Sequence, residues 1–231
     1  MNWSTKRAIV EAVATLNVEN LHAAKVPAPV GSSTTKNERS ENKDIQLTST
    51  YLSRQGSLNW IGQLGRIDCL TPISQAGSVM TSRKPSHIAK QSQIISYLNR
   101  TSDTTLTWDT NNHLTKANQL TYYSDGSYIG ESLDSRMGYV GVLNGGAVVS
   151  ESKLTKFQCS GVFDVEEAAA ALAAKDLIYR RQFLIEFGYP QEQTTLFCDN
   201  AATIQFTEKQ LITSLNKHIM ARGAYTRSLQ A

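Results

Sequence analysis

The sequence predicts an α/β fold in which a three-stranded antiparallel meander is joined by a helix to a fourth, parallel strand, with a mainly helical region before it. Three observations predict this order. Apolar residues recur at helical spacing in the first half, and the period changes to two from Leu120. Asn144-Gly145 separates two β-rich runs, which is the strongest short hairpin signal. An alanine-rich helical stretch then leads into the short apolar run 194–199, and a helical connection makes the joined strands parallel neighbours.

Length and composition are typical of a globular protein. The 231 residues suffice for one large domain or two small ones, and 40% hydrophobic with 19% charged residues is ordinary. No apolar run approaches the ~20 residues that span a bilayer, and the first residues lack a secretory signal. We expect an intracellular protein of the cytoplasm or nucleus without a membrane partner. Lys6 and Arg7 precede the first acid, Glu11, so a mitochondrial presequence is an alternative to an ordinary amphipathic helix.

The three cysteines are Cys69, Cys159 and Cys198, and no two of them form a CxxC pair. This spacing argues against a zinc site and a disulfide framework, and indicates a reducing compartment. We interpret them as small buried hydrophobes.

Charge is distributed unevenly along the chain. The formal net charge is +3, but residues 1–116 carry +5 and residues 117–231 carry −2. A basic first half suits a polyanionic partner and an acidic second half suits metal ions. The alternative, that an excess of five charges over 116 residues has no functional meaning, stays open.

The first half predicts helices around a polar segment. A helical face over 6–16 is followed by two prolines and then by a stretch without apolar residues, 31–44. Further helices are expected over 56–64, 72–80 and 88–97, the last capped by Ser86, with a short strand at 106–108. No residue type here suggests chemistry, so this half is interpreted as a scaffold.

In the second half, strands are expected over 120–125, 138–143 and 147–153. A long helix is expected to begin with Asp164 as N-cap and Glu167 as its capping-box partner, and to end at Gly188. Its expected packing stripe consists of Ala169, Leu172, Tyr179, Phe183 and Phe187. After the strand 194–199, Asn200 caps a helix over 201–206, and a last helical segment covers 215–229.

Carboxylates stand at the tips of two predicted strands. Asp125 ends the first and Asp199 ends the fourth, so parallel pairing places them at the same edge of the sheet. The first turn of the intervening helix adds Glu166 or Glu167, and periodicity does not decide between these two. Converging carboxylates repel one another unless divalent cations are shared, and Mg²⁺ prefers such oxygen ligands. Taken alone, Asp125-Gly126-Ser127 is more often only a turn.

These residues resemble the RNase H domain of copia-type LTR-retrotransposon polyproteins. The stretches that carry the resemblance in the second half are Tyr123–Tyr128, Met137–Val140, Asp164–Ala170, Thr195–Ala202 and Lys217–Ile219. The first half is similar to the end of the reverse transcriptase and its connection in the same polyproteins, through Leu16–Asn20 up to Pro29, Gly56–Trp60 and Ile94–Leu98.

The resemblance implies domain boundaries and an RNase H-like fold. Residues 1–30 are the end of the reverse-transcriptase region, 31–48 a polar linker, 49–116 a helical connection-like region, and 117–231 an RNase H-like domain lacking its last strand and helix.

The resemblance also implies hydrolysis of the RNA strand of RNA/DNA hybrids with two Mg²⁺ ions, Mn²⁺ being an alternative. Asp125, Glu166 and Asp199 are then three of the four acidic ligands. Glu166 is preferred to Glu167 because it aligns with the family glutamate. The family reads the shape and backbone of the hybrid, so no sequence preference is expected.

Three departures from the family pattern affect the expected activity. The paired polymerase aspartates are absent, so no DNA synthesis is expected. The family's fourth acid lies beyond a fifth strand, and this sequence ends at Ala231 before it. Met220 stands where relatives commonly have an acid, which leaves His218 as a polar candidate or as an ordinary helix-surface histidine.

Two functions therefore stay open. One is an RNase H-type nuclease, either a polyprotein fragment or a module completed by another chain. The other is a domesticated, non-catalytic scaffold or RNA-binding subunit of a larger ribonucleoprotein assembly, whose partners are structured RNA and other protein subunits. The three retained acids favour the first, whereas the missing fourth acid and the initiator Met1 favour a stand-alone product of the second kind.

Overall fold

A computed structural model describes residues 1–16, 24–29, 45–81, 84–109, 116–128, 135–209, 224–226 and 228. The chain divides into two compact units, Asn2–Leu106 and Thr107–Ala231, the second of which includes Met1. No helix in the described part of the chain is both long and apolar enough to cross a membrane.

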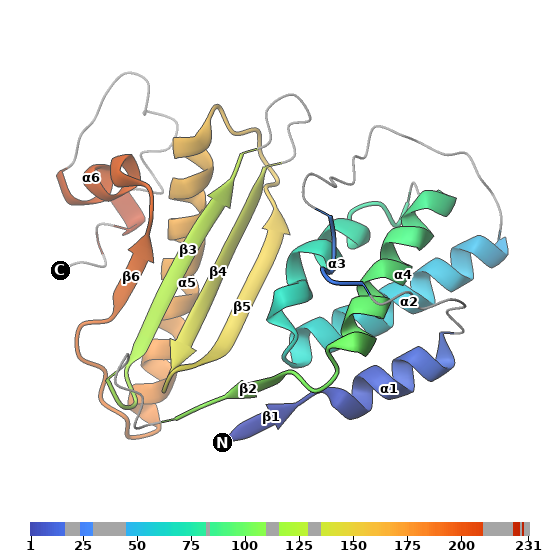
Figure 1. The fold of residues 1–231 in the computed structure, drawn as a ribbon. Coiled ribbons are helices and arrows are strands. Elements are labelled where there is room, and N and C mark those ends of the chain that lie inside the picture. Colours follow the sequence, from blue (N-terminus) through green and yellow to red (C-terminus); the bar gives the residue numbers. More distant parts are fainter. Residues whose placement is uncertain are drawn as a thin grey trace. The chain divides into compact units, whose positions relative to one another are not determined.

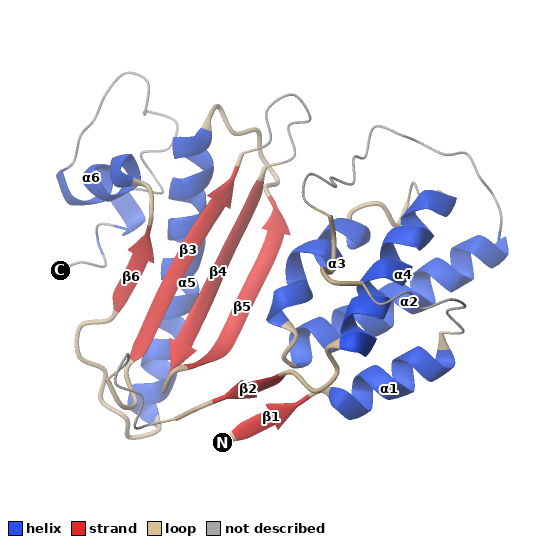
Figure 2. Cartoon of the chain, in the orientation of Figure 1, coloured by secondary structure: helices blue, strands red, loops and turns tan. Residues whose placement is uncertain are grey.

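The first unit is mainly helical, as the sequence predicts. Its elements are β1 (Asn2–Ser4), α1 (Lys6–Thr15), α2 (Ile45–Leu64), the 3₁₀ turn η1 (Ile67–Cys69), α3 (Leu70–Gly77), α4 (Pro85–Arg100) and β2 (Thr105–Thr107), which pairs with β1. Apolar residues of the four α-helices meet in one core, which contains Ile9, Leu58, Ile73 and Ile94. Figure 2 shows these helices in blue.

Two predicted boundaries in this unit are wrong. Helix α2 begins at Ile45, inside the predicted linker 31–48, because no glycine or proline opposes a helix between residues 45 and 55. Helix α4 is capped at Lys84 rather than at Ser86, because Pro85 occupies the first helical position, where its missing N–H costs nothing. The rest of the predicted linker, 31–44, lies outside the described residues.

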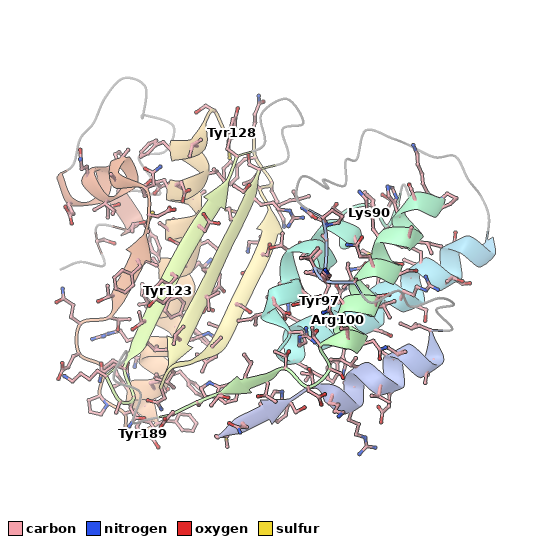
Figure 3. The ribbon with its side chains drawn as sticks, viewed as in Figure 1. Lys90, Tyr97, Arg100, Tyr123, Tyr128 and Tyr189 are labelled. Atoms are coloured by element: carbon pink, nitrogen blue, oxygen red, sulfur yellow. The ribbon has the colours of Figure 1, made fainter. Side chains whose placement is uncertain are left out.

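A buried ion pair stabilises the first unit. The Arg66 side chain is 1% exposed and donates to both carboxylate oxygens of Asp68, at 3.0 and 2.8 Å. It also donates to the Thr101 carbonyl, and its guanidinium lies 5.5 Å from the ring centre of Tyr97, which Figure 3 labels. The N–H groups of this buried cation are therefore hydrogen-bonded, and one of its faces lies against an aromatic ring, so the charge is not left unpaired.

The second unit has the predicted mixed sheet. Its elements are β3 (Leu120–Ser127), β4 (Arg136–Leu143), β5 (Gly146–Leu154), α5 (Val162–Glu186), β6 (Thr195–Cys198) and α6 (Ala201–Lys209). The strand order is β5-β4-β3-β6; β3 runs antiparallel to β4 and parallel to β6. Helix α5 lies along one face of this sheet (Figure 1). The predicted α/β architecture, a meander with a parallel fourth strand beyond a helix, is confirmed.

The hairpin between β4 and β5 forms at the predicted turn. Leu143 pairs with Gly146, and the two central residues, Asn144 and Gly145, have φ of 51° and 75°. Positive φ at both positions matches the twist of a two-residue hairpin, and asparagine and glycine tolerate it best.

Alternation along β3 divides its side chains between two environments. Leu120 and Tyr122 are buried in a core cluster with Tyr139 of β4 and Ala173 of α5. The opposite face carries Tyr123, which is 48% exposed. Asp125 follows it by two residues and therefore lies on the same face of the strand.

The packing face of α5 differs from the predicted stripe. Ala169 is buried and Leu172 packs against the core as expected, but Tyr179, Phe183 and Phe187 are 69, 49 and 66% exposed. The face against the sheet continues through Ala173 and Leu177, and its alanines let the helix lie close to the strands.

The predicted cap of α5 is also wrong. The helix begins at Val162, two residues before Asp164. The Asp164 carboxylate reaches back and accepts from the backbone N–H of Ser160 at 3.0 Å. The acid therefore acts from the first turn of the helix rather than from the residue before it, which removes Glu167 from the capping role.

Candidate metal centre

The strand register brings the two predicted aspartates to the same edge of the sheet. Ser124 of β3 and Cys198 of β6 are the last pair in the parallel ladder. Asp125 and Asp199 are the next residues of the two chains, and both are exposed. Two carboxylates thus reach solvent beside each other at the carboxyl end of parallel strands.

Helix α5 meets the same edge because Gly126 lets it approach. A Cβ at this position would lie 2.7 Å from the backbone nitrogen of Glu166 and 2.8 Å from the carbonyl carbon and oxygen of Val165. No side chain fits in that space, so only glycine permits this contact. The Gly126 N–H also donates to the Glu166 carboxylate. The tip of β3 and the first turns of α5 therefore hold one another in place.

Glu166 is the buried member of the group. Its residue is 5% exposed, and its Oε2 atom has no hydrogen-bond partner among the described residues. Burial, followed by the charges of Asp125 and Asp199, raises the pKa of Glu166 to about 7, although the Gly126 N–H acts in the opposite direction. A divalent cation would supply the missing partner and offset the repulsion, so the donor set fits such an ion.

The structure places Glu166, rather than Glu167, beside Asp199. Ligand atoms of Glu166, Cys198 and Asp199 all lie within 4.8 Å of one another. Neither Glu167 nor Asp125 is in this group, although the charge of Asp125 acts on Glu166. Both glutamates are buried on the same helix, at 5 and 1% exposed. Periodicity could not separate them, because the distinction depends on where Gly126 contacts the helix.

Cys198 is the residue of this site that sequence reasoning missed. It is half-buried, whereas Cys69 and Cys159 are the buried hydrophobes that the sequence predicts. Burial raises the pKa of the Cys198 thiol, against the effect of hydrogen bonds from the Asn200 backbone and the Ser124 side chain. The sequence signal that could have identified Cys198 is its position immediately before Asp199, in a strand that runs parallel to β3.

The chain beyond Asp199 is fixed by a predicted cap. The Oδ1 atom of Asn200 accepts from the backbone N–H of Thr203 at 2.9 Å, as expected for the first turn of α6. Glu208, the acid that follows Asp199 in sequence, is exposed on α6 and is not in the 4.8 Å group. His218 and Met220 lie outside the described residues, as does most of the predicted segment 215–229.

No arginine or lysine neutralises the three acids within the part of the chain that the structure describes. Elsewhere in the same unit, by contrast, Asp176 is paired with Arg180 at 2.8 Å. A basic side chain filling the space would indicate a site that no longer needs a cation. The described residues instead leave the negative charge of this edge uncompensated.

Comparison with known proteins gives one similar curated sequence. The Retrovirus-related Pol polyprotein from transposon TNT 1-94 of Nicotiana tabacum is 25% identical over 192 residues. The match covers 82% of this chain but 14% of that polyprotein, so the chain corresponds to a small part of its relative. No family model matches the chain.

Three solved structures of RNase H proteins are similar to about half of the chain. RNase H1 of Halobacterium salinarum is 18% identical, with 48% of this chain and 76% of that chain covered and a TM-score of 0.37. LC11-RNase H1, isolated from compost, is 15% identical, with 49% and 76% covered and a TM-score of 0.39. The N-terminal RNase H domain of rv2228c from Mycobacterium tuberculosis is 8% identical, with 49% and 75% covered and a TM-score of 0.38.

The sheet order places a parallel strand and its connecting helix next to an antiparallel meander, and the sequence is similar to a transposon polyprotein over most of its length. Together these findings support an RNase H-like fold for the second unit and a likeness of the chain to part of a retroelement polyprotein.

Proposed function

We propose that the chain hydrolyses the RNA strand of RNA/DNA hybrids with Mg²⁺, or with Mn²⁺ in its place. We further assign it to the copia-type elements that its motifs resemble. One observation carries the proposal: Glu166 is buried with an unpartnered Oε2 atom beside two exposed aspartates, and its burial, followed by their charges, raises its pKa to about 7. An enclosed acid beside two others is costly in a protein that binds no cation.

The three acids have different parts in this proposal. Asp125 and Asp199 are exposed, so they face both solvent and an approaching nucleic acid. The Glu166 carboxylate accepts a hydrogen bond from the Gly126 N–H and binds the cation from the buried side of the site. Asp125, Glu166 and Asp199 would hold divalent cations, whose chemistry would be to activate the attacking water and to stabilise the leaving oxygen. The three carboxylates position the cations and neutralise their positive charge.

The proposed substrate is a polyanion. The net charge of +5 on residues 1–116 supports a partner of this kind, whereas the acidic second half binds the cations. Recognition through backbone and shape would leave the enzyme without a preference for base sequence.

The test is a cleavage assay with the full chain on a hybrid whose RNA strand is labelled, in Mg²⁺ and separately in Mn²⁺. We expect Asp125→Asn to lose activity at least ~100-fold, because it removes a ligand charge from the site. Glu186→Gln is the matched control, since Glu186 is an exposed acid on the same helix as Glu166.

Wild-type protein that binds the hybrid without cutting it would overturn the proposal and favour the domesticated scaffold or RNA-binding subunit. Equal cleavage by wild type and Asp125→Asn would also overturn it, since the activity would then come from elsewhere.

A further inference from the structure

We propose that Cys198, Glu166 and Asp199 form a site for a thiophilic divalent cation, Zn²⁺, which overlaps the proposed Mg²⁺ site and makes it sensitive to inhibition by zinc. The binding itself does not depend on the proposed function, whereas the inhibition rests on it. The proposal departs from the sequence prediction, which argued against a zinc site because no CxxC pair is present.

The geometry of the three groups carries the proposal. The Cys198 Sγ atom and one carboxylate oxygen each of Glu166 and Asp199 all lie within 4.8 Å of one another. Glu166 is more than nine-tenths buried, and its unpartnered Oε2 atom belongs to the carboxylate in this group. The cluster therefore contains an enclosed, unsatisfied ligand as well as a thiol.

The spacing suits a tetrahedral ion after a small adjustment. Zinc binds thiolate at about 2.3 Å and carboxylate oxygen at about 2.0 Å, which puts adjacent sulfur and oxygen ligands about 3.5 Å apart. Closing from a separation of no more than 4.8 Å needs a movement of at most about 1.3 Å, and the exposed Asp199 side chain can supply it by a change of rotamer. The fourth position is left to water.

The ligand types separate the two cations. Mg²⁺ prefers oxygen ligands and binds sulfur poorly, whereas a thiolate strongly favours zinc. The oxygen-only set is Asp125, Glu166 and Asp199, and the sulfur-containing set replaces Asp125 with Cys198. Because Glu166 and Asp199 belong to both sets, the two ions compete. As the Zn–S bond forms, the thiol proton leaves to solvent.

The test uses the full chain, freed of metal and without nucleic acid. Cd²⁺ serves as the probe, since it binds as zinc does and its bond to thiolate gives an ultraviolet charge-transfer band. We expect a saturable band in wild type and none in Cys198→Ser. Cys159→Ser is the matched control, because Cys159 lies in the same unit but in the apolar core, 4% exposed. It should keep the band.

Zinc affinity, measured by competition with a chromophoric chelator, should fall at least ~10-fold in Cys198→Ser, the range seen when groups that support a metal site are removed. Circular dichroism establishes that each variant is folded, and Cys198→Ala serves if the serine variant is not. Absence of the band in wild type, or its persistence in folded Cys198→Ser, would overturn the proposal.

These outcomes are distinct from failure of the proposed function, because they involve no substrate. A cadmium band from a protein that cuts no hybrid would refute the nuclease and leave this site standing. If the nuclease is real, Zn²⁺ should inhibit wild type at a concentration at least ~10-fold lower than it inhibits Cys198→Ser, each relative to its own uninhibited rate.

Discussion

Replacing Glu166 with glutamine should stabilise the metal-free protein, although it removes a residue of the proposed site. The ionised carboxylate is buried beside two other negative charges, and its pKa stands at about 7 against an ordinary value of 4.5. At about 1.4 kcal/mol per pKa unit, full ionisation costs the folded state up to ~3 kcal/mol. Solvent reaches Asp125 and Asp199 and screens part of this, so we expect a gain of about 1–2 kcal/mol.

The sign of the pH dependence follows from the raised pKa. The folded state holds the Glu166 proton more tightly than the unfolded state, so the protonated form contributes stability that is fully present below pH 4.5. That contribution is lost as the pH rises through about 7. Glutamine resembles the protonated acid, so the difference between variant and wild type should be large at about pH 8 and small at about pH 4.

The assay is urea unfolding in the presence of a chelator at these two pH values, with Glu186→Gln as control. The control should stay within ~0.5 kcal/mol of wild type, because Glu186 is exposed. Saturating Mg²⁺ should stabilise wild type more than Glu166→Gln. A Glu166→Gln variant that is no more stable than wild type at the higher pH would refute the idea that these carboxylates repel one another.

Three further substitutions test the structure around the site and in the first unit. Gly126→Ala should cost about 1–3 kcal/mol and weaken Mn²⁺ binding, because its Cβ meets the backbone of Glu166 at 2.7 Å; unchanged metal binding would refute the contact. Tyr122→Phe should cost about 1.5–3 kcal/mol in urea unfolding, because its hydroxyl donates to Asp176 at 2.8 Å from a fully buried residue, and a neutral result would contradict that bond. Arg66→Lys should cost about 2–4 kcal/mol, since lysine cannot reproduce the two bonds to Asp68; thermal unfolding that matches wild type would count against a buried pair.

Much of the second unit could be predicted from the sequence, because its signals are local. The alternation from Leu120, the Asn144-Gly145 turn and the Asn200 cap each depend on a few adjacent residues. The convergence of Asp125 and Asp199 follows from one topological rule, that a helical connection joins parallel strands. The strand register confirms the parallel pairing of β3 and β6 that this rule predicts, up to the residue before each aspartate.

What sequence reasoning missed depends on contacts between distant residues. Gly126, forty positions earlier, contacts the backbone at Glu166, and no periodicity in the helix predicts this contact. The aromatic residues of α5 predict one packing face, but these residues are exposed. The helix packs on the sheet through a face whose alanines allow close approach. Cys198 looked like a core residue because its neighbour Glu166 comes from another element.

A titration with Mn²⁺ tests the claim that Asp125, Glu166 and Asp199 act as one divalent-cation site. Free Mn²⁺ is followed by electron paramagnetic resonance with wild type, Asp125→Asn, Asp199→Asn and the control Glu186→Gln. We predict saturable binding to wild type and to the control, and at least ~10-fold weaker binding to each aspartate variant. Binding that is absent from wild type, or equal in all four proteins, would contradict the claim.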